Sequence, residues 1–216
     1  PKAADVLAKV FGERIYSIKK FNFDYFSLDG SSQLIAKTGY SRIGGFEIYL
    51  SRPELGSSLW ETILEAGRSE NIRPGSPNII DRVEAGLLSF GNEMTVENTP
   101  LECNMDKFLD INKEADYIGK KVLQRQIRYG IKRRIRGIIY NGPKLPTISR
   151  PLQVFDIDKR TIVGSLTSGA FSPHFKRNIG VGMIKYGYWD NNKKILVNIA
   201  DQEFREGLIK DLPLVQ

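Results

Sequence analysis

AKTGYSRIGGFEIYL, residues 36–50, is the stretch that decides how the first part of this chain folds. A short apolar run leads into a turn with three glycines, and apolar and polar residues then alternate. That period-2 alternation is typical of a half-buried strand. The pattern therefore predicts a strand, a glycine-rich turn and a second strand. The second strand is expected to carry Phe46, Ile48 and Leu50 on one face and Glu47 and Tyr49 on the other.

Glu47 stands two residues beyond the glycine pair Gly44-Gly45, and its role has two interpretations. Because glycine permits positive φ and leaves space above the backbone, a flat ligand can approach this turn closely. The Glu47 carboxylate would then receive N–H groups of that ligand. In the alternative interpretation the stretch is an ordinary β-hairpin whose Glu47 points to water. The spacing alone leaves both open.

The composition of the 216 residues, 41% hydrophobic and 26% charged, fits one or two globular domains. No apolar run approaches the roughly 20 residues of a membrane span, and no secretory signal is visible. The single cysteine, Cys103, excludes an internal disulfide, and together with the single histidine, His174, it argues against a zinc site. We therefore expect no metal, no membrane and a reducing, cytoplasmic setting.

The net charge of +7 favours anionic partners without naming one. Charge alone would suggest nucleic acid, but the most basic segment has one aromatic residue, Tyr129, and no recognisable nucleic-acid-binding motif. We therefore expect no nucleic-acid partner, and interpret the segment as a solvated helix face that runs into a strand. Attraction of a polyanionic small molecule is a further interpretation. The basic residues of this segment are Lys120, Lys121, Arg125, Arg128, Lys132, Arg133, Arg134 and Arg136.

Helical and strand-like patterns alternate through the first 129 residues. Apolar spacing of three and four residues, with Gly12 and Gly67 as stop signals, marks the helices, and β-rich runs beside turn residues mark the strands. In the helix at 56–67, the inward residues are expected to be Leu59, Trp60, Ile63 and Leu64. The expected helices span 2–11, 56–67, 78–90 and 120–129, and the expected strands span 21–26, 33–37 and 46–50.

The sequence pattern changes near residue 130, where short β-rich runs begin to alternate with turns of Gly, Pro, Asn and Asp. Several short strands at this spacing predict a separate small β-barrel or sandwich. We therefore expect an α+β chain with two domains, 1–129 and 130–216. The expected strands of the second domain are 135–140, 152–156, 162–165, 179–183 and 194–199.

Four segments together resemble the folate-dependent glycine-cleavage T-protein (aminomethyltransferase) family. They match family signatures in the same order and at compatible spacing, so the resemblance spans nearly the whole chain. It implies a T-protein-like fold, in which a folate-binding and ferredoxin-like α+β region precedes a C-terminal β-barrel. The segments are TGYSRIGGFEIYL (38–50), DRVEAGLLSFG (81–91), DYIGKKVL (116–123) and GSLTSGAFSPHFKRNIGVGM (164–183).

The resemblance also implies an activity and a set of ligands. The implied reaction moves a methyl or aminomethyl-derived one-carbon unit from a small methylated or aminomethylated donor to tetrahydrofolate. Tyr40 and Glu47 match family positions that contact the pterin, and Asn78 stands where T-proteins usually have an arginine. These three residues are the candidate cofactor-binding residues. A carboxylate suits a pterin, because it accepts the ring N–H and the adjacent exocyclic amine side by side.

An N-terminal portion that the family possesses has no counterpart in this sequence, which opens at Pro1 rather than at Met. In the family that portion carries the catalytic aspartate. The resemblance therefore assigns no residue of this chain the catalytic role, and it makes the N-terminal portion of the same protein an expected partner. We expect this chain to be inactive alone.

Several departures from the T-protein pattern resemble the dimethylsulfoniopropionate demethylase branch instead. Besides Asn78, Leu87 replaces a frequent tyrosine, and residues 41–45 read SRIGG rather than Thr-Gly-Glu-Asp-Gly. Demethylation is therefore an alternative specific activity. A non-catalytic iron–sulfur assembly factor of the same fold is a second alternative. That branch carries a Lys-Gly-Cys motif near the position where this chain has Ile118-Gly119-Lys120, which contains no cysteine.

The remaining charged residues of the motifs have modest expected roles. Asp81, Arg82 and Glu84 are expected to form a structural ion pair more readily than a ligand site. His174 is expected in a loop and not as a general base. The basic segment 120–136 offers a place for the polyglutamate tail of a folate.

Overall fold

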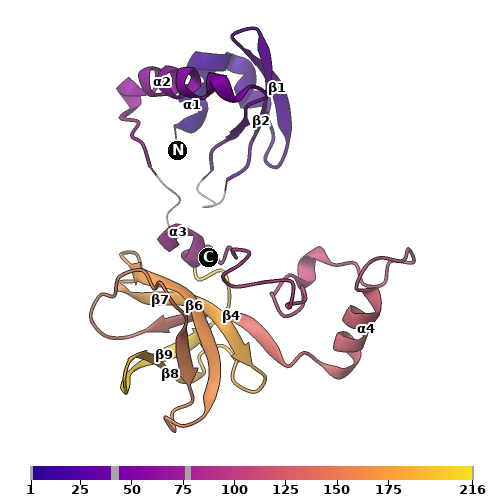
Figure 1. Cartoon of the computed structure of the whole chain (residues 1–216), viewed down its shortest axis with the longest axis vertical. Coiled ribbons are helices and arrows are strands. Elements are labelled where there is room, and N and C mark those ends of the chain that lie inside the picture. The colour runs from indigo at the N-terminus through magenta and orange to yellow at the C-terminus, as the bar shows by residue number, and fades with distance from the viewer. Residues whose placement is uncertain (1, 40–43, 76–78, 216) are drawn as a thin grey trace. The chain divides into compact units, whose positions relative to one another are not determined.

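The computed structural model describes residues 2–39, 44–75 and 79–215, and the chain divides into two compact units (Figure 1). The N-terminal unit is Pro1–Asn78 and the C-terminal unit is Ile79–Gln216. The packing boundary thus differs from the expected division at 129/130, because residues 79–129 cluster with the barrel. As a statement about domains, the boundary near residue 130 stays a prediction.

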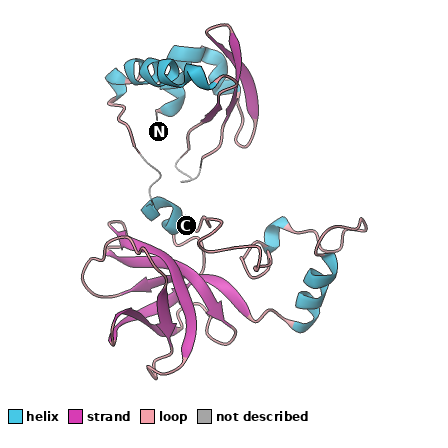
Figure 2. Cartoon of the chain, viewed as in Figure 1, coloured by secondary structure: helices cyan, strands magenta, loops and turns pink. Residues whose placement is uncertain are grey.

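The N-terminal unit is a two-layer structure of helices on one face of an antiparallel sheet. Phe26 and Ile35 of the strands pack with Leu7 of the first helix, and Leu28 packs with Leu59 of the second. No helix among the described residues of this unit covers the other face of the sheet (Figure 2). Its elements are α1 (Ala3–Phe11), β1 (Phe23–Leu28), β2 (Ser31–Ala36), β3 (Glu47–Tyr49) and α2 (Gly56–Ala66), with 3-10 turns at Glu13–Ser17, Pro53–Leu55 and Arg68–Glu70.

The two predicted strands on either side of the glycine-rich turn are confirmed, whereas residues 40–43 of the turn lie outside the described residues. Strands β2 and β3 pair antiparallel, with Ile35 opposite Ile48 and Ala36 opposite Glu47. Glu47 and Tyr49 are exposed, whereas Phe46, Ile48 and Leu50 are half-buried, as the alternation predicts. Strand β3 is short, however, and it begins only at Glu47.

The prediction for Trp60 is wrong. Leu59 is buried and Ile63 is half-buried in the core of the N-terminal unit, but the Trp60 side chain is 53% exposed. Leu59 and Ile63 are four residues apart and therefore lie on one stripe of α2, whereas Trp60 lies about 100° around the helix from Leu59. The sheet covers only the stripe of α2 that carries Leu59 and Ile63.

The C-terminal unit contains a closed six-stranded antiparallel barrel in the order β4-β7-β6-β5-β8-β9, which confirms the expected barrel (Figure 2). Its interior is filled by buried aliphatic side chains and Tyr140. The helices are α3 (Ile79–Glu84) and α4 (Lys120–Tyr129), with a 3-10 turn at Asp106–Phe108. The strands are β4 (Arg133–Tyr140), β5 (Leu152–Phe155), β6 (Ile162–Ser172), β7 (Arg177–Lys185), β8 (Lys194–Ala200) and β9 (Glu203–Lys210).

Strand β9 was not predicted, and Gly207 accounts for the omission. This glycine interrupts the apolar alternation, which makes the segment a poor strand by pattern. In the barrel, a Cβ at Gly207 would lie 2.9 Å from Cβ of Tyr140. The glycine therefore leaves the space that the buried Tyr140 side chain needs, and the strand forms because both of its edges are paired.

Helix α3 is shorter than the expected helix at 78–90. The amide of Gly86 donates to the Val83 carbonyl (3.1 Å) and the amide of Leu87 donates to the Arg82 carbonyl (2.8 Å). Gly86 has φ +66°, so this pair of bonds is a Schellman termination. The apolar spacing continues past Gly86, but the helix ends at Glu84.

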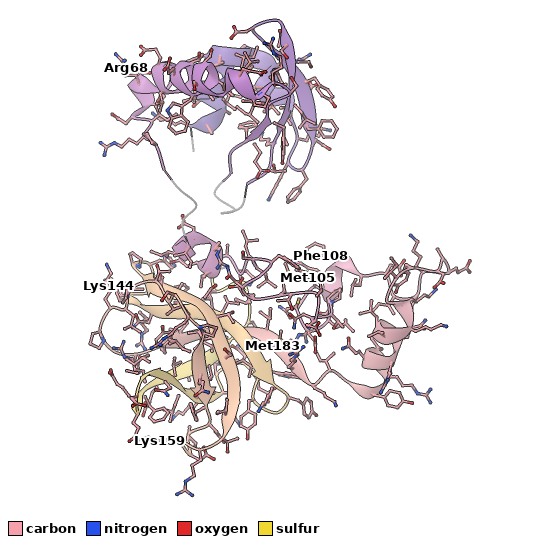
Figure 3. All side chains as sticks on the ribbon, viewed as in Figure 1. Arg68, Met105, Phe108, Lys144, Lys159 and Met183 are labelled. Carbon is pink, nitrogen blue, oxygen red and sulfur yellow. The ribbon has the colours of Figure 1, made fainter. Side chains whose placement is uncertain are left out.

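A second apolar cluster lies on the outer side of β4 and β7, beneath α3. Buried Val83 and Cys103 pack there against Ile135 of the barrel, and Met105 and Met183, both labelled in Figure 3, pack against the cluster. Burial raises the pKa of the Cys103 thiol. Cys103 is therefore a core residue and not a reactive thiolate.

Candidate functional site

The Glu47 carboxylate lies at the start of β3 and is exposed. The hydroxyl of Thr38, which precedes the glycine-rich turn, donates a hydrogen bond to Oε2 of Glu47. The two ends of the turn are therefore tied together by side chains, and the carboxylate has a fixed direction. Its remaining lone pairs are available to a ligand.

Glu47 shares its face of the sheet with aromatic side chains. The strand register places Phe23, Ala36 and Glu47 in one row across the three strands. The next row on the same face consists of Tyr25, Leu34 and Tyr49. We call the surface made by these two rows the open face, because no helix that the structure describes in the N-terminal unit covers it.

The open face is shaped like a shallow shelf beside a carboxylate. The side chains of Phe23, Tyr25 and Tyr49 are 58%, 54% and 56% exposed, and the rings of Phe23 and Tyr25 meet edge to face with centroids 5.9 Å apart. Ala36, between Phe23 and Glu47, contributes only a methyl group. Since neighbouring strands are about 4.8 Å apart, Phe23 and Glu47 stand about 10 Å apart across this gap.

The chemistry of the open face matches a flat ligand that carries adjacent N–H groups. A carboxylate accepts two parallel N–H donors in a charge-assisted arrangement. Aromatic faces and edges contribute contact area and fix the orientation of a stacked ring. Among the described residues, the open face thus has the chemistry to hold a flat ligand in one orientation.

Two of the three candidate cofactor-binding residues, Tyr40 and Asn78, lie outside the residues that the structure describes. Their assignment stays a prediction. The sequence reasoning did not propose Phe23, Tyr25 or Tyr49 as site residues. The alternation of β3 already placed Tyr49 on the face of Glu47, whereas Phe23 and Tyr25 join the site only through the register of β1 on β2.

Arg82 is part of a buried structural network, so the ion-pair interpretation is confirmed for this residue. Its guanidinium donates to both carboxylate oxygens of Glu93, at 3.1 and 3.3 Å, and to the hydroxyl of Ser168 on β6 at 2.6 Å. It also donates to the Leu87 carbonyl at 3.2 Å. The network fastens α3 to the barrel and leaves the guanidinium 7% exposed.

The Ser172-Pro173-His174 turn is also held by internal contacts. Ser172 donates to the carboxylate of Glu84 at 2.5 Å and accepts the amide of Phe175 at 3.0 Å. His174 is exposed and meets the ring of Phe175 edge to face. The motif therefore stabilises the junction between α3 and the barrel.

The basic segment forms α4 and the beginning of β4, as the interpretation of a helix face running into a strand requires. Part of its charge is neutralised within the unit. Arg133 pairs with Glu102 at 3.0 Å, and Arg134 pairs with Asp106. Other cations of the segment, such as Arg125 and Lys132, are exposed.

Within the described ranges, no helix is both long and apolar enough to cross a bilayer. The reducing, cytoplasmic setting expected from the single cysteine stays a prediction.

Comparisons with known proteins agree on one family. The model of the GCVT N-terminal domain matches residues 1–113, and the model of the glycine cleavage T-protein C-terminal barrel domain matches residues 133–214. Together the two models cover the open face and the barrel.

Individual relatives include both enzymes whose motifs the sequence resembles. The dimethylsulfoniopropionate demethylase of Ruegeria pomeroyi is 40% identical over 189 residues, which are 88% of this chain and 50% of the relative. The aminomethyltransferase of Caldanaerobacter subterraneus is 37% identical over 212 residues, which are 97% of this chain and 55% of the relative. The chain thus spans about half the length of the curated relatives it matches.

A solved structure shares the fold. The aminomethyltransferase T of the glycine cleavage system from Bartonella henselae matches with a TM-score of 0.81 and 23% identity, over 100% of this chain and 57% of that chain. At this identity the likeness supports the fold alone.

Proposed function

Because this chain belongs to the glycine-cleavage T-protein (aminomethyltransferase) family, we propose that the protein is a tetrahydrofolate-dependent one-carbon transferase. The observation that carries the proposal is the exposed Glu47 carboxylate beside the aromatic side chains of the open face. Family membership names the ligand class, and the open face supplies a surface of the matching chemistry.

The open face fits a pterin in three respects. The Glu47 carboxylate accepts the ring N–H and the exocyclic amine as a pair. Ala36 has the smallest side chain of its row, and the exposed rings of Tyr49 and Phe23 lie on the same face as Glu47. Thr38 holds the carboxylate in place. Tyr40 and Asn78 remain proposed additional ligands, on the strength of the family motif alone.

The proposed reaction needs positioning more than acid–base machinery. Tetrahydrofolate, as the acceptor substrate, supplies the lone pair of N5. In the methyl version, one carbon–sulfur bond of the donor breaks, one N5–carbon bond forms, and N5 loses its proton to solvent or to a protein base. In the aminomethyl version, the carbon loses both its amine and its bond to the carrier, forms bonds to N5 and N10, and each of these nitrogens loses its proton. Because a sulfonium or a protonated amine is already a good leaving group, the role of Glu47 and Tyr49 is to hold the acceptor in line. Such positioning supplies about 7–11 kcal/mol of a barrier.

A second candidate is the demethylase version of the same reaction. It is favoured by the 40% identity to the dimethylsulfoniopropionate demethylase and by the departures at Asn78 and Leu87 from the T-protein pattern. In this version the transferred group is a methyl from a sulfonium, and the acceptor leaves as the 5-methyl form. The iron–sulfur assembly alternative has less support, because Cys103 is buried in the core.

We also propose that the active protein includes an N-terminal portion beyond this chain. The chain covers only 50% and 55% of the two relatives, and in the family the catalytic aspartate belongs to the part that has no counterpart here. The 216-residue chain alone should therefore give no turnover. Measurable product formation by this chain without an added N-terminal portion would contradict this part of the proposal.

Mass spectrometry of the folate product tests the proposed function. The full-length protein is incubated with tetrahydrofolate and a panel of methylated sulfonium and amine donors, plus an aminomethylated carrier protein. A 5-methyl product supports the demethylase version, and a 5,10-methylene product supports the aminomethyltransferase version. Folate bound without any product from the panel would count against a transferase and in favour of a binding protein.

A further inference from the structure

Helix α4 lies at the outer end of the C-terminal unit, beyond the strands of the barrel, and is almost uncovered (Figure 1). Of its ten residues, all of which the structure describes, Leu123 alone is buried. The Thr99 hydroxyl also donates to the side-chain oxygen of Gln126 at 2.7 Å. A helix of this length is marginal in water unless its apolar side packs against something. One leucine and one side-chain hydrogen bond are a small anchorage for it.

An exposed apolar stripe, made by Val122 and Tyr129, runs along one side of α4. These two residues lie about two turns apart on the same side of the helix. They form one wall of a groove of about 860 Å³, and the other wall includes Ile131 and Tyr186. Because exposed apolar side chains that gather around a hollow are typical of an interaction surface, we expect another protein segment to cover this stripe.

The charges of α4 restrict the kind of segment that fits. Basic residues in the first turn oppose the helix dipole, which favours anions there. A covering segment that is apolar at its centre and carries carboxylates at its edge would therefore suit α4. A second copy of α4 would bring like charges together and is a poor occupant. The helix has no acidic residue, and its basic residues are Lys120, Lys121, Arg125 and Arg128.

We propose that the apolar stripe of α4 is a docking surface for the N-terminal portion of the same protein. The chain spans only 50% and 55% of two relatives, so a long segment is available as the occupant. The match to the Caldanaerobacter aminomethyltransferase covers 97% of this chain, so that relative combines a counterpart of α4 with the length that this chain lacks. The docked segment buries Val122 and Tyr129, and its carboxylates pair with Lys121 and Arg125. The inference rests on the N-terminal portion proposed above and not on the folate chemistry.

Hydrogen exchange of the α4 amides, followed by mass spectrometry in the full-length protein and in the 216-residue chain, tests the proposal. The amides should exchange at least about tenfold more slowly in the full-length protein, because docking suppresses local opening of the helix. Val122→Gln should remove most of that protection. It should change exchange in the 216-residue chain little, since glutamine is a better helix former than valine.

The matched control is Ile127→Gln, which changes an aliphatic residue of the same helix to the same amide. Ile127 is 56% exposed and Val122 is 52% exposed, so the two side chains are equally available in the 216-residue chain. Ile127 lies about 140° around the helix from Val122 and therefore outside the apolar stripe. The full-length control variant should keep the protection of α4.

Three results would overturn the proposal: equal exchange of α4 in the two proteins, undiminished protection in Val122→Gln, or an equal loss in Ile127→Gln. Protection that rises with protein concentration would assign the stripe to a second copy and also overturn it. Circular dichroism checks that the variants fold, and the milder Val122→Ala replaces Val122→Gln if that variant misfolds. The folate product of the same full-length samples separates the two proposals. Product without protection of α4 would overturn the docking alone, and protection without product would contradict the proposed function alone.

Discussion

Two charged residues of the sequence motifs, Arg82 and Glu47, have opposite surroundings in the folded chain. Arg82 is 7% exposed, and its guanidinium donates to a carboxylate, a hydroxyl and a backbone carbonyl. Glu47 is exposed, and Thr38 is its one hydrogen-bond donor among the described residues. In sequence, both are simply charged residues within a motif of the same family.

The difference separates residues that hold the fold from residues that meet a ligand. A buried charge requires partners on every side, so a complete set of partners indicates a structural role. An exposed charge costs little to keep, so its presence beside exposed aromatic side chains calls for another explanation. For the open face, we propose that the explanation is the folate ligand that the family implies.

Removing the carboxylate of Glu93 tests whether the buried Arg82 has a structural role. Glu93→Ala leaves Arg82 buried and without its ionic partner, and breaking a buried pair in this way costs about 3–5 kcal/mol. The free energy of unfolding of the C-terminal unit, measured in urea, should fall by that amount. Glu97→Ala, in the same loop but exposed, is the matched control and should change little. A loss below about 1 kcal/mol for Glu93→Ala would contradict the structural role.

The buried Tyr140 makes stability depend on high pH. Its hydroxyl has no hydrogen-bond partner in the barrel, and burial raises its pKa from 10.0 to about 12. In the unfolded chain this tyrosine ionises from about pH 10, so stability falls as pH rises from 10 to 12. The loss is about 1.4 kcal/mol per pH unit, roughly 3 kcal/mol in all.

Tyr140→Phe should remove that dependence, because phenylalanine cannot ionise. The difference in unfolding free energy between the two proteins, measured from pH 8 upward in the range the protein tolerates, should begin to change near pH 10. Parallel curves for the two proteins would show that Tyr140 ionises normally in the folded barrel.

Replacing Glu47 tests whether its exposed carboxylate binds the ligand. Glu47→Gln removes the charge-assisted pair to the pterin, which is worth about 2–3 kcal/mol. Tetrahydrofolate should therefore bind the full-length variant about 30- to 150-fold more weakly. Because Glu47 is exposed, the unfolding free energy should stay within about 0.5 kcal/mol of the wild type. Unchanged affinity would return Glu47 to the ordinary hairpin interpretation.

Tyr49 is expected to have the smallest of these effects. Its ring contributes contact area beside the carboxylate, so Tyr49→Ala should weaken tetrahydrofolate binding by about 1 kcal/mol, roughly fivefold. Trp60→Ala is the control, since Trp60 is equally exposed but lies on α2. It should leave affinity unchanged. Equal weakening in both variants would indicate a general effect of losing surface aromatics.

Local patterns predicted much of the fold. The alternation in residues 46–50 gave the correct faces of β3, and the helix at 120–129 was predicted with the observed bounds. Pattern reasoning failed where distant contacts decide the outcome. Trp60 satisfies helical periodicity, but the sheet covers only the neighbouring stripe. Strand β9 contains Gly207, and the reason for a glycine there is evident only in the folded barrel, where a Cβ at this position would lie too close to Tyr140.

The candidate site was predicted less completely than the fold. Glu47 emerged from the motif, but its aromatic neighbours Phe23 and Tyr25 depend on strand register, which the sequence does not state. The partner of Arg82 was missed for a similar reason. Glu93 lies in a polar segment that appears solvated by composition, and it becomes buried only when the segment folds against the barrel.

The most direct test of the central claim is a backbone amide spectrum of the isotopically labelled chain, recorded while tetrahydrofolate is added to millimolar concentration. The largest shifts are expected at Glu47, Tyr49 and the cross-strand Ala36, and the amide of Arg82 should not shift. Absence of shifts on the open face, or largest shifts at Arg82 and Glu93, would contradict the assignment of Glu47 to the ligand and Arg82 to the fold.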